Sequence, residues 1–192
     1  MISIKTFRLV FLMLIVSLFL QPDLIAQNYS VDNQKSSLKI LGTSSLHDWV
    51  ITAEKQKGNI QILETENFTL EDLKISFDVE ALKSGKSGMD KNTQKALNYS
   101  DYKTIDFNLN KVKSITKTAT GYDVIVVGEL SISGTKKLID LMFNLKKENG
   151  TIKLIGEKKL KMTTFNIEPP KALLGTIKTG DDITIQFNTI FK

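Results

Sequence analysis

Apolar and polar side chains alternate over most of the chain beyond residue 70. In "DLKISFDVEAL", Leu73, Ile75 and Phe77 alternate with Lys74 and polar neighbours. The same period of two recurs in "KTIDFNLNKV", "YDVIVVGELSI", "LIDLMFNLKK", "TIKLIGEKKLKMT" and "DDITIQFNTIFK". Because successive side chains of a strand point to opposite faces, this pattern predicts half-buried antiparallel strands.

Turn signals separate these segments. "KENGT" places Asn149-Gly150 between two alternating runs, which is a strong hairpin signal. "ATGYD" around Gly121, "SGTKK" around Gly134 and "KTGDD" around Gly180 indicate further turns. Many short strands without a linker or an internal repeat predict one all-β domain, either a sandwich or a barrel.

One segment departs from this period. In "MDKNTQKALNYSDY", Met89, Thr93, Ala96 and Leu97 lie near helical spacing, and "SGMD" offers capping residues. The sequence therefore predicts a short helix over about 90–97, packed on or closing one end of the sheet structure.

The first 26 residues have the order of a secretory signal peptide. Lys5 and Arg8 precede the apolar run "LVFLMLIVSLFL", and "QPDLIA" ends at the small residue Ala26. The apolar run is shorter than the roughly 20 residues that span a bilayer, which disfavours a membrane anchor. We expect cleavage after Ala26 and a mature domain over 27–192, periplasmic or secreted, with no stable membrane span.

Composition excludes several classes of site. The chain has no cysteine, so it has no disulfide, no thiolate metal ligand and no lipid attachment site after the apolar run. Arg8 is the only arginine despite a net charge of +5. Since arginine is the side chain that most often contacts bases, this argues against nucleic-acid binding. We expect no metal and no cofactor.

Catalytic constellations are also missing. His47 is the only histidine, and its neighbour Asp48 would point to the opposite face of a strand. No "GxSxG" segment accompanies it, so a serine, histidine and acid triad is disfavoured. The lysines of "GEKKLKMTT", Lys158, Lys159 and Lys161, could meet a phosphate at a pocket mouth, although a solvated strand face is the stronger alternative.

The chain is rich in apolar side chains that could face an interior. Phenylalanines stand in almost every predicted strand. A small barrel either fills itself with such side chains or encloses one ligand-sized cavity. Both alternatives stay open on the residues alone.

The order of three motifs resembles the YceI-like family. They are "YSVDNQKSSLKILGTSSLHDW", "MDKNTQKALNYSDYKTIDFNL" and "VVGELSISGTKKLIDLMFNL". The resemblance covers about 29–192 and includes a histidine in the early strands, at the place of His47.

The resemblance implies an extended antiparallel lipocalin-like β-barrel, periplasmic and non-enzymatic. Such barrels hold a long isoprenoid chain, of a polyprenyl phosphate or a quinone-like lipid, for transport, storage or an envelope stress response. Pro169-Pro170 interrupts the last strand pair and sets one barrel mouth apart from the family pattern. The alternative is a filled-core exported module that acts through its surface, and a homodimer is left open.

Alternation and the resemblance together predict which residues line the lumen. We expect His47 and Trp49 to share the inward face of one strand, with His47 near a barrel end. The expected ligand-binding residues are His47, Trp49, Phe77, Phe107, Val126, Phe143, Phe165 and Phe187.

Overall fold

The computed structural model describes residues 26–64 and 68–192. Its strands are β1 (Gln27–Ser30), β2 (Ser37–Ser44), β3 (Trp49–Ala53), β4 (Gln56–Glu64), β5 (Phe68–Asp78), β6 (Leu82–Lys83), β7 (Thr104–Thr118), β8 (Gly121–Ile132), β9 (Thr135–Glu148), β10 (Thr151–Lys161), β11 (Lys171–Ala172) and β12 (Ile177–Phe191). The described part also holds one α-helix, α2 (Ser87–Ala96), and the 3-10 turns η1 (Val79–Ala81), η2 (Met162–Phe165) and η3 (Leu173–Gly175). Apart from Ala26, the predicted signal peptide lies outside the described residues. None of the described helices is long and apolar enough to cross a membrane.

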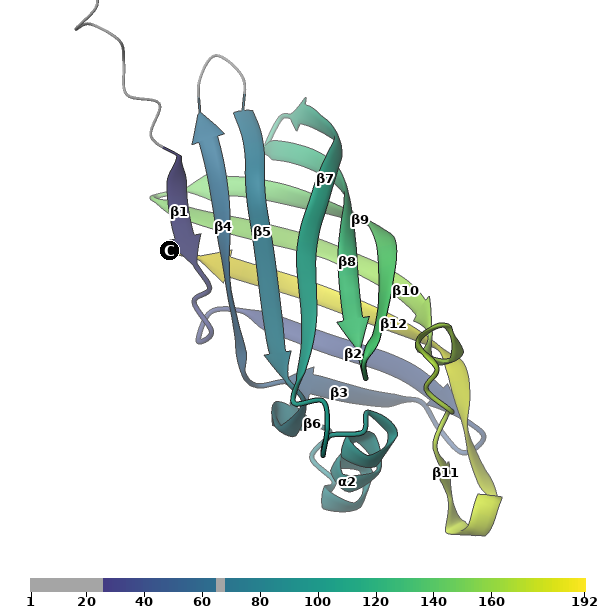
Figure 1. Ribbon diagram of the computed structural model, residues 1–192. Helices are drawn as coiled ribbons and strands as arrows, with labels where there is room; N and C mark the ends of the chain where they lie inside the picture. Colours follow the sequence, from purple (N-terminus) through teal and green to yellow (C-terminus); the bar gives the residue numbers. More distant parts are fainter. Residues whose placement is uncertain (1–25, 65–67) are drawn as a thin grey trace, which may run out of the picture.

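All strands belong to one antiparallel sheet (Figure 1). Its order is β1-β4-β5-β7-β8-β9-β10-β12-β2-β3-β6, and β11 pairs with β12. The alternating segments explain the curl, because their apolar positions, such as Leu73 and Val124, are buried on the inner face. The predicted all-β antiparallel barrel with one short helix is confirmed.

The barrel is closed at one end by the meeting of β1 and β12. The amide of Ser30 donates to the carbonyl oxygen of Lys192 at 2.8 Å, and the amide of Lys192 donates back to Ser30 at 2.8 Å. Val31 and Phe191 form the adjoining bridge. The last strand in the chain is thereby joined to the first, which closes the ring of strands from β1 to β12.

Apolar side chains fill this closed end. Ile60, Ile62, Leu145, Ile152 and Phe191 have no exposed surface. Full burial of such a side chain contributes about 1.5–3 kcal/mol, so this end supplies much of the stability of the barrel.

The opposite end is covered by α2 (Figure 1). The helix was predicted over about 90–97 and is observed at Ser87–Ala96. Its N-cap Lys86 makes no side-chain capping bond. Instead, the carboxylate of Asp90 accepts hydrogen bonds from the amide of Ser84 at 2.8 Å and from its hydroxyl at 2.6 Å. These bonds tie the first turn of the helix to the preceding loop.

One predicted turn is wrong. "KTGDD" around Gly180 lies inside β12, where the pairing with β2 shifts between Thr179 and Ile183. A bulge accommodates an extra residue without ending a strand, so the glycine and aspartates bend β12 instead of reversing it. The Asn149-Gly150 turn is confirmed, with positive φ at both residues, as a two-residue hairpin requires.

The segment containing Pro169-Pro170 shapes the open end. After η2 the chain crosses to β11, whose short hairpin with β12 projects from the barrel (Figure 1). The amide of Thr179 donates to the carbonyl oxygen of Pro170 at 3.1 Å, which holds this crossing against β12.

Candidate functional site

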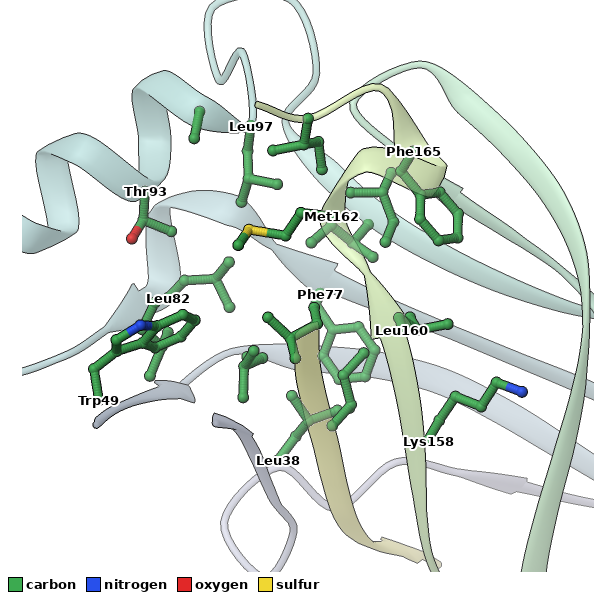
Figure 2. A pocket seen from close by; sticks show the side chains of 18 of the residues that line it. Leu38, Trp49, Phe77, Leu82, Thr93, Leu97, Lys158, Leu160, Met162 and Phe165 are labelled. Atoms are coloured by element: carbon green, nitrogen blue, oxygen red, sulfur yellow. The ribbon is translucent and has the colours of Figure 1, made fainter. Parts of the chain in front are cut away.

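A cavity of about 490 Å³ lies inside the barrel, between the filled end and α2 (Figure 2). Its deep part is bordered by Leu154 and Thr189, and its open end by His47, Met89 and Pro170. Most of the wall between them is apolar. The stretch of β12 that lines it runs from Ile177 to Thr189, roughly 35–40 Å at the rise of an extended strand. The cavity is therefore elongated along the barrel.

Seven of the eight residues predicted to bind ligand border this cavity: His47, Trp49, Phe77, Phe107, Phe143, Phe165 and Phe187. They come from β3, β5, β7, β9, η2 and β12 and from the loop before β3. That they contact a ligand stays a prediction.

Val126 is the exception. It points inward from β8, as alternation predicts, but it has no exposed surface and does not border the cavity. Its cross-strand neighbours are Val112 of β7 and Leu141 of β9, and it belongs to the main apolar cluster. Alternation identifies an inward position, but it does not tell whether the space in front of that position is filled.

His47 does not lie on a strand. β3 begins at Trp49, and His47 is exposed in the loop between β2 and β3. The hydroxyl of Ser44 donates to the carbonyl oxygen of His47 at 2.7 Å and so closes this loop. The Nδ1–H of His47 donates to the carbonyl oxygen of Asp48 at 2.8 Å. The predicted strand position is wrong because a serine-stabilised turn ends the ladder first, yet His47 still lies at an edge of the cavity.

Three of the aromatic side chains in the wall lie over glycines. The ring of Trp49 occupies the space of a β-carbon on Gly42, its direct cross-strand partner. Phe107 lies in the same way over Gly128. A β-carbon on Gly156 would lie 2.7 Å from Cζ of its partner Phe187. Since these glycines lack side chains, the rings can lie close to the sheet and leave space at the centre.

One polar group in the deep wall has no partner. Thr189 is 1% exposed, and its hydroxyl makes no hydrogen bond within the described residues. A buried hydroxyl without a partner costs about 1–3 kcal/mol.

The charged residues that border the cavity are all basic. They are Lys86, Lys158, Lys161 and Lys171, and no aspartate or glutamate lies among the lining residues. Lys161 pairs with Asp182 at 3.1 Å, and Lys171 pairs with Glu168 at 2.8 Å. The hydrogen bond from Lys171 lowers the pKa of Glu168 and raises the pKa of Lys171. Lys86 and Lys158 take part in no ion pair within the described residues.

The structure separates the two interpretations of the lysines in β10. Lys159 is exposed on the outer face, as on a solvated strand. Lys158 is half-buried and borders the cavity together with Leu154 and Leu160. The alternation of β10 places residues 154, 158 and 160 on one side, so the inward position of Lys158 was detectable in the sequence.

The arrangement can bury an apolar chain. The one histidine is exposed and engaged with a backbone carbonyl. Within 26–64 and 68–192, no three histidine or acidic side chains gather closely enough to hold a metal ion.

The comparisons with known proteins point to one family and one fold. The model of the YceI-like domain family matches residues 29–191. No curated protein sequence matches the chain. Among solved structures, BcnA of Burkholderia cenocepacia superposes with a TM-score of 0.69 at 15% identity, covering 83% of this chain and 98% of BcnA.

Two further structures have the same fold. A polyisoprenoid binding domain from Saccharophagus degradans, implicated in plant cell wall breakdown, gives a TM-score of 0.67 at 14% identity, with 85% of this chain and 97% of that domain covered. The YceI protein of Campylobacter jejuni gives 0.57 at 16% identity, with 71% and 80% covered. At these identities the likeness concerns the fold.

Proposed function

The chain belongs to the family of proteins with a YceI-like domain, and we propose that its cavity binds the apolar chain of an isoprenoid-type lipid without catalysing a reaction. The hollow, elongated and largely apolar interior carries this proposal. A filled barrel would have no room for a ligand, whereas this wall leaves an elongated space that an apolar chain could occupy.

The hydrophobic effect supplies the affinity. Each methylene group moved from water into an apolar wall contributes about 0.8 kcal/mol, so a chain of several isoprene units binds without any reactive group. A volume of about 490 Å³ falls within the roughly 300–1,000 Å³ of ligand pockets. The likeness to a domain described as polyisoprenoid binding supports this choice of lipid class.

We further infer that the protein works outside the cytoplasm, periplasmic or secreted. The apolar segment before Ala26 supports this inference, since it has the order of a signal peptide. Carriage or storage of the lipid, or a role in an envelope stress response, is the corresponding physiological function. The ligand would be a polyprenyl phosphate or a quinone-like lipid.

Native mass spectrometry of the purified mature protein tests the proposal. We expect an adduct that organic extraction releases as an isoprenoid-type lipid, and uptake of a polyprenyl probe after its removal. The same spectra give the oligomeric state, including a homodimer.

A pair of variants ties the lipid to the cavity. Ile185 lines the wall, whereas its neighbour Gln186 is exposed on the outer face. Ile185→Trp narrows the cavity and is expected to weaken uptake, while Gln186→Trp keeps it. Circular dichroism establishes that both variants fold. If the unaltered protein carries no lipid and takes up no probe, the proposal is wrong, and the alternative of a module that acts through its surface is favoured.

A further inference from the structure

The pairing between β9 and β10 stops before either strand ends. Their ladder runs from Thr151 opposite Glu148 to Gly156 opposite Phe143. Beyond this point β9 stays paired with β8 as far as Thr135, and β10 stays paired with β12 as far as Lys161. The two strands diverge there (Figure 1). We call the unpaired stretch, 135–142 of β9 and 157–161 of β10, the side gap.

The cavity reaches both edges of the side gap. Ile139 and Leu141 of β9 and Leu160 of β10 all line it. On the outer face of β9, Leu138 and Met142 are 65% and 61% exposed. A lipid at the side gap would therefore contact apolar side chains on both faces of the sheet.

Of the charged residues in this gap, Lys158 and Lys161 border the cavity, and Lys158 is the one that takes part in no ion pair within the described residues. Two residues beyond Gly156 on the inner face of β10, it projects away from the apolar side chains grouped around Phe77 (Figure 2). Its positive charge also acts on Asp140 of β9, at the other edge of the side gap. Lys113 lowers the pKa of Asp140 the most, and the charge of Lys158 lowers it further. Asp140 already pairs with Lys113 at 2.6 Å.

Lys158 thus has no counter-ion of its own among the described residues. A half-buried charge beside an apolar wall gains from a counter-ion, because desolvation of an unpaired charge is costly. The lining contains no acidic side chain that could serve as its partner. An anion carried by the ligand would supply the missing charge.

We propose that Lys158 binds the oxyanion head group of the lipid at the side gap, while the tail fills the cavity. This inference rests on the proposed function and narrows its ligand to lipids with a phosphate or carboxylate head. An ammonium group binds such oxyanions as a point charge and forms charge-assisted hydrogen bonds with them.

The affinities of matched ligands test the inference. Geranylgeranyl phosphate and geranylgeraniol share one tail and differ in head group, and a long-chain fatty acid supplies the carboxylate. We expect the phosphate to bind roughly 10- to 100-fold more tightly than the alcohol, the range of a charge-assisted hydrogen bond. The ratio of the affinities for the phosphate and the fatty acid shows which of the two oxyanions, phosphate or carboxylate, the site prefers.

Variants at neighbouring positions assign the preference to a residue. Lys158→Met should reduce the ratio of phosphate to alcohol affinity to near one. Lys159→Met removes the same charge from the outer face of the same strand and should keep the ratio. Loss of the ratio in Lys86→Met but not in Lys158→Met would place the head group under α2 and overturn the proposal.

The absence of cysteine permits a chemical rescue. In Lys158→Cys, reaction with aminoethyl methanethiosulfonate rebuilds a side chain ending in an ammonium, whereas methyl methanethiosulfonate leaves a neutral one. We expect the first reagent to restore the phosphate preference and the second to leave it absent. Equal binding of phosphate and alcohol by the unaltered protein overturns the role of Lys158 alone, while binding of neither ligand overturns the proposed function.

Discussion

The indole ring of Trp49 occupies the space in which residue 42 would carry a β-carbon if it were not glycine. The two residues are direct partners on β2 and β3. The ring is also fixed at its edge, because Nε1 donates to the carbonyl oxygen of Thr43 at 2.9 Å. Gly42 therefore determines where the only tryptophan of the chain can lie.

A methyl group at position 42 should displace this ring. We expect Gly42→Ala to destabilise the protein by about 1–3 kcal/mol through overpacking and to weaken lipid uptake. Urea unfolding measures the first effect, and the emission of the single tryptophan reports displacement of the ring directly. In α2, a β-carbon on Gly88 would meet no atom within 4 Å. Gly88→Ala should thus keep the emission, and a similar loss of stability in both variants would contradict the role of the ring.

The unpartnered hydroxyl of Thr189 predicts a stabilising substitution. Thr189→Val keeps the shape of the side chain and removes a buried polar group without a partner. We expect a gain of about 1 kcal/mol in the free energy of unfolding, measured by urea denaturation of the lipid-free protein. Thr184→Val, on the other face of β12, serves as the control and should change stability little. A loss of stability in Thr189→Val would show that its hydroxyl has a bound partner in solution.

The closed end of the barrel should weaken in acid. Asp32 is buried, and the hydrogen bond from Lys192 Nζ at 3.0 Å, assisted by the amide of Gln34, lowers the pKa of Asp32 below its usual 3.8. Because the pKa of Asp32 is lower in the folded protein than in the unfolded chain, its carboxylate stabilises the fold at pH values above the unfolded pKa. This contribution is lost as the pH falls through the folded pKa. Below about pH 4, the stabilities of the unaltered protein and of Asp32→Asn should therefore converge.

Urea midpoints across this range measure the effect. Glu71→Gln is a suitable control, since Glu71 is exposed on β5 and takes part in no ion pair within the described residues. A constant difference between the protein and Asp32→Asn at every pH would contradict the role of the carboxylate.

Signal cleavage should leave the barrel intact. β1 begins at Gln27, so removal of residues 1–26 keeps every strand of the sheet. We expect the intact mass of protein exported by a two-membrane bacterium to correspond to a first residue of Gln27. Substitution of Ala26 by a bulky residue such as Phe should block processing, and an exported form that still carries residues 1–26 would contradict the prediction.

The sequence predicts the sheet better than it predicts the cavity. Period-two alternation places Phe143 and Val126 on inner faces, and both point inward. Only Phe143 borders the cavity, because the space before Val126 is filled by side chains from other strands. Strands around a hollow interior and strands around a filled one show the same alternation in sequence. Whether the interior is hollow depends on how strands that are distant in the chain pack together.

Local turn chemistry explains the other differences. Ser44 closes a loop that removes His47 from the strand, and the bulge in β12 absorbs the glycine and aspartates that suggested a turn at Gly180. Nothing in the sequence of β9 or β10 predicts the side gap, since both strands continue through it and only their mutual pairing ends. Lys158, in contrast, could have been found from the apolar residues at alternate positions around it.

The backbone hydrogen bonds between Ser30 and Lys192 have a consequence for how the protein folds during synthesis. They join residues from nearly opposite ends of the domain, so a chain that emerges from its N-terminus cannot make this contact until almost every strand has been released. Contacts of such long sequence separation slow folding, because a large loop must close before any of them forms. The cavity wall is therefore completed late, so a ligand can enter a finished cavity only after the whole domain has been synthesised.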